Sequence, residues 1–196
     1  MKGRPRTEFL RDIQSSRLKG YYRKVFEAAT QKESLWFFFS ITLLFIQHGY
    51  QAEMEILKFH LQEVMQRMEM DANPDGFATI ILDEVNYEKD KLLKTACHRL
   101  SVEGDFVNYN HLYHGVLMES SAQSAGIQLA DFSAGVMNGF LRGALLDRGR
   151  YEFATDLFQQ YIKPNLRRVC GNVMGYGIRE VPKNTEVREI LRKQLV

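Results

Sequence analysis

Carboxylate side chains end two apolar runs of the sequence. Asp83 and Glu84 follow the run TIIL, and Glu119 follows the run HGVLM. Apolar runs of this kind predict strands of an α/β sheet, and sites form where the carboxyl ends of such strands meet. Adjacent strand residues point to opposite faces, so only one of the first two acids can share a site with another element. Asp83 is favoured, because it directly follows the apolar run.

A further acid lies in the segment SSAQSAGIQLADFSAG, residues 120–135. At about 100° per residue, Ser124, Gln128 and Asp131 fall on one face of a predicted helix, at about 0°, 40° and −20°. Small and apolar side chains gather on another face: Ile127, Ala130 and Ala134. A buried carboxylate needs a hydrogen bond, an opposite charge or a metal ion, so Asp131 needs a partner if this helix lies inside a domain.

Carboxylates that converge in one place repel one another. A divalent cation relieves this repulsion, and an oxygen-rich ligand set favours Mg²⁺ or Mn²⁺. Two such ions about 3.5–4 Å apart activate a water and stabilise the leaving oxygen in phosphodiester cleavage. The spacing therefore permits a metal-dependent nuclease. The structural alternative is that these acids are helix caps and solvated strand ends, which are common roles for Asp and Glu.

Other reactive residue types form weaker patterns. His111 and His114 are three residues apart in a predicted strand, which places their rings on opposite faces and disfavours zinc binding. Ser120, Ser121 and Ser124 show neither a Gly-x-Ser-x-Gly elbow nor a Ser-His-Asp order, so caps and turn bonds explain them more simply. The two cysteines form no Cys-x-x-Cys pair and fit a reduced, cytoplasmic compartment.

Length and charge narrow the class of protein. The chain has 196 residues, 45% of them hydrophobic, which predicts one domain with a C-terminal appendage. The 26 basic and 24 acidic residues give a net charge of +2, which neither supports nor excludes a nucleic-acid substrate. The apolar run LWFFFSITLLFI is shorter than the about 20 residues that cross a bilayer, so no membrane partner is expected.

The sequence alternates predicted helices and strands. We expect helices over residues 8–30, 52–70, 87–100, 126–146 and 151–163. We expect strands over residues 35–46, 77–84 and 111–119, with a buried helix as the alternative for the first. The continuous apolar run in the second predicts an interior strand covered on both faces. Gly135, Gly139 and Gly143 recur every four residues and predict a smooth groove that a neighbouring backbone can approach closely.

The segment SSAQSAGIQLADFSAG, preceded some forty residues upstream by TIILDE, resembles the domain of unknown function 3800 family. Members of that family look like ribonuclease H-type folds. They carry a helix start of the form Ser-x-x-Ser-x-Gly-hydrophobic-Gln-hydrophobic-Ala-Asp and an Asp at the end of an earlier hydrophobic strand. The helix pattern matches here at Ser121, Ser124, Gly126, Gln128, Leu129, Ala130 and Asp131, and the strand pattern at Asp83 and Glu84.

The resemblance implies roles for these residues. Asp83 and Asp131 are the expected catalytic residues and ligands of Mg²⁺ or Mn²⁺, and Glu119 is a third candidate ligand. The residues expected to orient the ligands or contact the substrate are Glu84, Ser124, Gln128 and Lys2. Lys2 occupies the lysine position of the family's second motif, Glu-hydrophobic-Lys. The resemblance covers roughly residues 2–146, and the family's leading Asp-Glu-Ser-Gly strand has no counterpart, so an N-terminally truncated domain is expected.

These observations predict an α/β chain with a ribonuclease H-like mixed sheet flanked by helices over residues 1–146. A helical and irregular C-terminal appendage is expected over residues 147–196. The expected function is that of a metal-dependent nuclease-like hydrolase acting on phosphodiester bonds of DNA or RNA in the cytoplasm of a bacterium or in a phage setting. One alternative is a non-catalytic subunit that retains the fold and binds nucleic acid or protein. Another is an oligomerisation module built on the glycine-lined helix face, with a second copy of the chain as partner.

Overall fold

The computed structural model describes residues 16–31, 35–42, 50–72, 75–146, 149–180 and 185–195. Within them the chain forms two compact units. The first unit contains residues 16–37 and 129–166, and the second contains residues 38–128 and 167–195. Lys2 and the first half of the helix expected over residues 8–30 lie outside the described residues.

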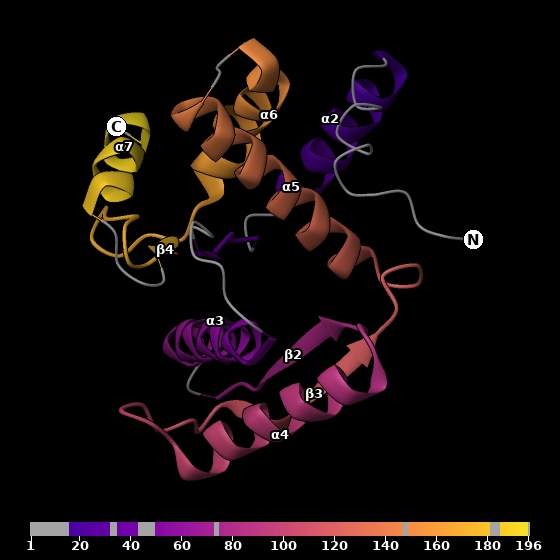
Figure 1. Ribbon diagram of the computed structural model, residues 1–196, viewed down its shortest axis with the longest axis vertical. Coiled ribbons are helices and arrows are strands. Elements are labelled where there is room, and N and C mark those ends of the chain that lie inside the picture. Colours follow the sequence, from indigo (N-terminus) through magenta and orange to yellow (C-terminus); the bar gives the residue numbers. More distant parts are fainter. Residues whose placement is uncertain are drawn as a thin grey trace. The chain divides into compact units, whose positions relative to one another are not determined.

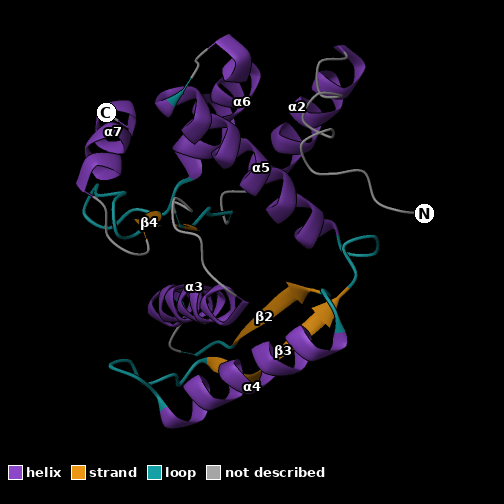
Figure 2. Cartoon of the chain, viewed as in Figure 1, coloured by secondary structure: helices purple, strands orange, loops and turns teal. Residues whose placement is uncertain are grey.

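The first unit is helical in its described part (Figures 1 and 2). Its long helices are α2 (Ser16–Thr30) and α5 (Ala125–Leu145), of which α5 begins in the second unit. The expected helix over residues 151–163 is found as successive segments: η1 (Gly149–Tyr151), α6 (Glu152–Leu157), η2 (Phe158–Ile162) and η3 (Lys163–Asn165). Phe140 of α5 stacks on Phe158, with ring centres 3.9 Å apart, and both rings are buried.

Two glycines of α5 allow α6 to pack closely. A Cβ atom added to Gly139 would lie 2.5 Å from the Cβ of Ala154, a distance that real Cβ atoms do not tolerate. A Cβ on Gly143 would lie 3.2 Å from the Cβ of Tyr151. The expected close approach is therefore found, and its partner is another segment of the same chain. Gly139 and Gly143 are therefore not open to a second copy, whereas Gly135 is, and an oligomerisation module on this helix face stays a prediction.

The second unit contains two pairs of parallel strands. β2 (Ala78–Asp83) pairs with β3 (Leu112–Glu119), and β1 (Phe39–Ile41) pairs with β4 (Ile178–Glu180). Parallel strands need a long crossover connection, and α4 (Tyr87–Glu103) supplies it between β2 and β3. α3 (Tyr50–Asp71) precedes β2, and α7 (Thr185–Leu195) follows β4.

The core of the second unit forms between the β2–β3 pair, α3 and α4, and Figure 1 shows α4 running along the two strands. α4 begins at Asn86, whose side-chain oxygen accepts the Lys89 N–H at 2.9 Å, and it ends at Gly104, which has a positive φ of 71°. The buried apolar residues of this core are Leu61, Met65, Ile80, Leu93, Cys97, Tyr109, Leu112 and Val116.

The β2–β3 pair is covered on one face only within the described residues of its unit. Ile80 and Val116 are buried against the helices, whereas Ile81 and Leu117 on the other face are 46% and 49% exposed. The expectation of a strand covered on both faces is therefore wrong for β2 in this unit. The continuous apolar run fits two covered faces, but α3 and α4 reach only the side chains that point to one of them.

The expected α/β class is confirmed, with a mostly helical chain and parallel strand pairs. Within the expected strand over residues 35–46, the structure has β1 at Phe39–Ile41 only. Residues 43–46 lie outside the described residues. The single mixed sheet of a ribonuclease H-like fold and the boundary at residue 146 stay predictions. Among the described residues, no helix is long and apolar enough to span a membrane.

Candidate functional site

The register of the β2–β3 pair brings two of the predicted acids together. Asp83 is the Cα partner of Glu119 at the last position of each strand. Register partners in a parallel pair project to the same face, so both carboxylates lie on the exposed face beside Ile81 and Leu117. The Glu84 N–H donates to the Glu119 carbonyl at 3.1 Å and extends the ladder one residue further. The sheet therefore fixes the backbone positions of Asp83 and Glu119 relative to each other.

Asp83 also anchors the loop that leads from β3 to α5. Its Oδ1 accepts the Ser121 N–H at 3.0 Å, and the Gln128 side-chain amide donates to the Ser121 carbonyl at 2.7 Å. The Ser121 residue is thus held from both sides, by a carboxylate from β2 and an amide from the first turns of α5. Asp83 is half-buried, whereas Glu84 and Glu119 are exposed.

Ser124 is the N-terminal cap of α5. Its hydroxyl oxygen accepts the Ile127 N–H at 3.4 Å, and its carbonyl accepts the Gln128 N–H at 3.0 Å. Serine at this position satisfies an N–H group that has no partner within the helix. Through Gln128 these bonds reach Ser121, which binds Asp83, and the expected role of Ser124 and Gln128 in orienting a metal ligand stays a prediction. Their contact with a substrate stays a prediction.

Asp131 is exposed on α5. The expectation that a carboxylate inside a domain needs a partner therefore does not apply to it. The predicted apolar face is also corrected, because Ala130 and Ala134 are exposed. The buried side chains of α5 are Ile127, Ser133, Val136, Met137, Phe140 and Leu141. Asp131 belongs to the first unit, whereas Asp83 and Glu119 belong to the second, and a metal site shared by Asp83 and Asp131 stays a prediction.

Asp83 and Glu119 have oxygen atoms available for a ligand. In the described part of the chain, neither Oδ2 of Asp83 nor the Glu119 carboxylate makes a hydrogen bond or an ion pair. Two carboxylates on the same face, at the end of a strand pair, create a negative potential that a bound cation offsets. Among the described residues, no group of three or more His, Cys, Asp or Glu side chains is arranged to hold a metal ion.

Sequence reasoning missed two polar clusters of the second unit. His60 lies between two hydroxyls, with Nδ1 2.5 Å from Ser40 Oγ and Nε2 2.9 Å from Thr42 Oγ1. Burial lowers the pKa of His60, and the nearby Glu63 only partly opposes this shift. The second cluster surrounds Asp105, which accepts hydrogen bonds from Gln62 Nε2, Gln66 Nε2, the Tyr109 hydroxyl and the Val107 N–H. The signal that could have indicated it is the spacing of Gln62 and Gln66, four residues apart in an apolar helix stripe.

Ordinary surface or core histidines are expected at positions 111 and 114 instead of zinc ligands, and His111 has a structural role. Its Nδ1 lies 2.7 Å from the Glu69 carboxylate, which also accepts the His111 and Asn110 N–H groups. Burial raises the pKa of Glu69, but these hydrogen bonds outweigh it and leave the pKa below its ordinary value. Glu69 therefore fixes the segment that enters β3.

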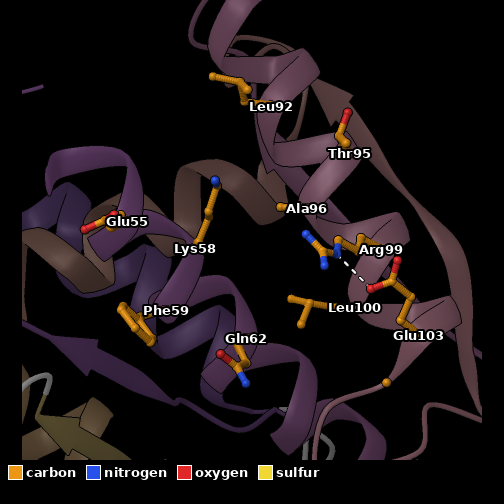
Figure 3. Close-up of a pocket in the computed structure, with 11 residues that line it drawn as sticks. Glu55, Lys58, Phe59, Gln62, Leu92, Thr95, Ala96, Arg99, Leu100 and Glu103 are labelled. Atoms are coloured by element: carbon orange, nitrogen blue, oxygen red, sulfur yellow. Dashed lines mark hydrogen bonds and ion pairs between the residues drawn. The ribbon is translucent and has the colours of Figure 1, made fainter. Parts of the chain in front are cut away.

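A groove of about 640 Å³ lies between α3 and α4. Figure 3 shows Lys58 from α3 and Arg99 from α4 pointing into it, with Arg99 Nε donating to Glu103 at 2.7 Å. Phe59, at the side of the groove, is 56% exposed. None of the residues that line the groove is one of the predicted site residues, so the candidate site rests on the sheet end and not on this groove.

Comparison with models of known protein families, with curated proteins and with solved structures gives no match for this chain.

Proposed function

We propose that the end of the β2–β3 pair is a divalent-cation site of a ribonuclease H-like, metal-dependent nuclease-like protein that acts on phosphodiester bonds of DNA or RNA. The observation that supports this function is the register that pairs Asp83 with Glu119 at the same end of two parallel strands. Like charges held this close favour the binding of a cation, since it offsets their repulsion.

The donor set fits Mg²⁺ or Mn²⁺. Both ions prefer oxygen ligands, and Mg²⁺ in particular keeps several waters and uses only one or two carboxylates of the protein. The exposed Glu119 and the half-buried Asp83 provide such an open site. A cation bound there would activate a water and stabilise the leaving oxygen of a phosphodiester.

The chain's own residues orient the proposed ligands. The Ser121 N–H holds one oxygen of Asp83 and leaves Oδ2 to face a ligand. Gln128 holds Ser121 in turn, so the position of Asp83 depends on the start of α5. The contribution of Asp131 is an expectation from sequence, and Asp131→Asn tests it in the experiments below.

Thermal unfolding in Mn²⁺ tests the cation site. An ion that binds only the folded state stabilises it by about 2.7 kcal/mol at a hundredfold excess over Kd, so the melting temperature of the wild type should rise with Mn²⁺. Asp83→Asn should lose most of this rise, because it removes one anionic ligand and keeps the size of the side chain. Glu103→Gln, which removes an exposed carboxylate at the end of α4, is the matched control and should keep the rise.

Cleavage is measured separately with labelled single- and double-stranded DNA and RNA in Mn²⁺. Activity in the wild type that disappears in both Asp83→Asn and Asp131→Asn supports the nuclease. Equal cleavage by the wild type and both variants would assign the activity to a contaminant and contradict the nuclease function.

The second candidate function is a non-catalytic subunit that binds nucleic acid or protein. The hydrogen bond from Ser121 to Asp83 favours it, because this bond gives the carboxylate a structural role without any ion. In this case Mn²⁺ leaves the melting temperature unchanged, and Asp83→Ala costs about 1 kcal/mol from the lost hydrogen bond. Titration of labelled nucleic acid in EDTA would then show binding that does not depend on a metal.

A further inference from the structure

Three arginines lie close together in the second unit. They belong to other elements than Asp83 and Glu119 of the candidate site. Arg67 is on α3, Arg167 follows η3, and Arg179 is on β4. Their side chains are 12%, 9% and 28% exposed, respectively. Guanidinium groups are rarely buried unless they are paired, so three together need an explanation.

Glu63 and one turn of the chain link the three arginines. Glu63 bridges Arg67 and Arg179, with its Oε2 2.7 Å from Arg67 Nη1 and its Oε1 3.3 Å from Arg179 Nε. Arg67 Nη2 donates to the Gly175 carbonyl at 2.8 Å. The guanidinium carbon of Arg167 lies 5.7 Å from the ring centre of Tyr176, the next residue.

Each arginine keeps one N–H group without a hydrogen-bond acceptor. Among the described residues, the buried atoms Arg67 Nε, Arg167 Nη1 and Arg179 Nε make no hydrogen bond, although Arg179 Nε lies within ion-pair distance of Glu63. The buried acceptor Glu63 Oε2 of the same cluster makes none either. Leaving a buried donor unsatisfied costs free energy, so native structures supply an acceptor to nearly all of them. The unsatisfied donors outnumber the one unsatisfied acceptor, which indicates that the cluster lacks acceptors.

The net charge of the three-arginine cluster indicates which kind of acceptor group it lacks. Arg167 pairs with both oxygens of Asp71, and Glu63 serves the other two arginines. Glu180, the partner of Arg188, also interacts with Arg179, so four positive charges face three negative ones. Burial lowers the pKa of Arg67; Glu63 opposes this shift, while the neighbouring Arg179 and Arg167 add to it. A water molecule would accept hydrogen bonds but would leave the excess charge in place.

The pair Arg188–Glu180 in the same unit is a structural pair and serves as a comparison. Arg188 donates from Nε and Nη2 to both oxygens of Glu180, whose side chain is 3% exposed. Here one guanidinium meets one carboxylate. The three-arginine cluster differs in both its charge balance and its unsatisfied donors.

We propose that Arg67, Arg167 and Arg179 form a binding site for one phosphate group, either inorganic phosphate or the phosphate of a small monoester. A phosphate has several acceptor oxygens and negative charge, and guanidinium N–H groups bind it with strong, charge-assisted hydrogen bonds. Arg179 is the most exposed of the three. This site does not depend on the proposed function, and Asp83→Asn should bind phosphate as the wild type does.

Equilibrium dialysis with radiolabelled inorganic phosphate tests the site directly. The wild type should bind one phosphate with saturation, and more weakly as the salt concentration rises. Arg179→Gln should bind at least about tenfold more weakly, since it removes a charged hydrogen-bond donor. Arg99→Gln removes an exposed arginine that pairs with Glu103, and it should bind as the wild type does.

Competition experiments distinguish inorganic phosphate from the phosphate of a monoester as the ligand. Displacement of the label by AMP but not by adenosine would show that a monoester phosphate enters the site, and failure of AMP would restrict the site to inorganic phosphate. Circular dichroism checks that Arg179→Gln is folded, and Arg179→Lys replaces it if it is not. Absence of saturable phosphate binding by the wild type, or equal binding by the wild type and the folded Arg179 variant, would overturn the proposal.

Discussion

Asp83 and Asp105 are both half-buried aspartates of the second unit, but their surroundings differ. Asp105 accepts four hydrogen bonds, three of them from side chains. Asp83 accepts a single backbone N–H and keeps its second oxygen unbonded within the described residues. The number of donors around a carboxylate therefore distinguishes an acid that holds the fold from one that has capacity left for a ligand.

The difference also appears in the chemistry of the two sites. Burial raises the pKa of Asp105, but the donors around it outweigh this effect and leave the pKa below its ordinary value. Burial raises the pKa of its partner Tyr109, and the Asp105 carboxylate raises it further. Asp105 is thus kept ionised by neutral donors, whereas Asp83 has an acidic neighbour, Glu119.

Removing Asp105 should have the largest effect on stability. Asp105→Ala leaves the side-chain donors of Gln62, Gln66 and Tyr109 without their acceptor, and we expect a loss of about 3 kcal/mol in the free energy of unfolding. Urea denaturation measures it. Asp90→Ala, which removes an acceptor of one backbone N–H, is the matched control and should lose only about 1 kcal/mol. Equal losses would contradict the distinction drawn from the number of donors.

Acid should reduce the effect of that substitution. The pKa of Asp105 is lower in the folded than in the unfolded chain, so its stabilising contribution is present above the ordinary Asp value of 3.8 and is lost as the pH falls through the folded pKa. The difference in unfolding free energy between the wild type and Asp105→Ala should therefore shrink below about pH 4. Urea denaturation of both proteins from pH 7 to pH 3 measures this, and a difference that stays constant would contradict it.

Loss of Gln128 should have a smaller effect. Gln128→Ala removes the bond to the Ser121 carbonyl, and we expect a loss of about 1 kcal/mol without metal. Because Ser121 then holds Asp83 less firmly, the rise in melting temperature with Mn²⁺ should also become smaller. Gln123→Ala, an exposed neighbour in the same loop, is the control. An unchanged response to Mn²⁺ would show that Ser121 does not orient a ligand.

Asp83→Asn should have the smallest effect on the metal-free protein, less than about 0.5 kcal/mol. The amide oxygen can still accept the Ser121 N–H, and the substitution removes a negative charge next to Glu119. Thermal unfolding in EDTA measures it. A loss as large as that of Asp105→Ala would place Asp83 among the structural acids and contradict the comparison.

The sequence allowed prediction of the elements and of one local juxtaposition. Apolar runs located β2 and β3, and helical patterns located α3, α4 and α5. Acids at the ends of the two predicted strands led us to expect Asp83 and Glu119 at one edge of a sheet, and the register pairs them there. The bond from Gln128 to Ser121 was not predictable, since it depends on how the loop turns between β3 and α5.

Neither the buried face of α5 nor the cluster of buried charged residues could be predicted from the sequence. Spacing placed Ala130 and Ala134 on an apolar face, but small side chains carry little hydrophobic signal, and the large residues from Val136 onward determine the buried face. The arginines at positions 67, 167 and 179 are far apart in the chain, and no short-range pattern links them. Such clusters depend on tertiary contacts and leave no periodic signature.

The pairing of β2 on one side has a consequence for amide hydrogen exchange. The N–H groups of Ala78 and Glu84 donate toward β3, which places the even-numbered amides of the strand on the paired side. The odd-numbered amides point the other way, where the described residues of this unit supply no strand. In D₂O, Ile81 should therefore exchange faster than Ile80 and Leu82, and slow exchange at Ile81 would reveal an additional strand at this edge.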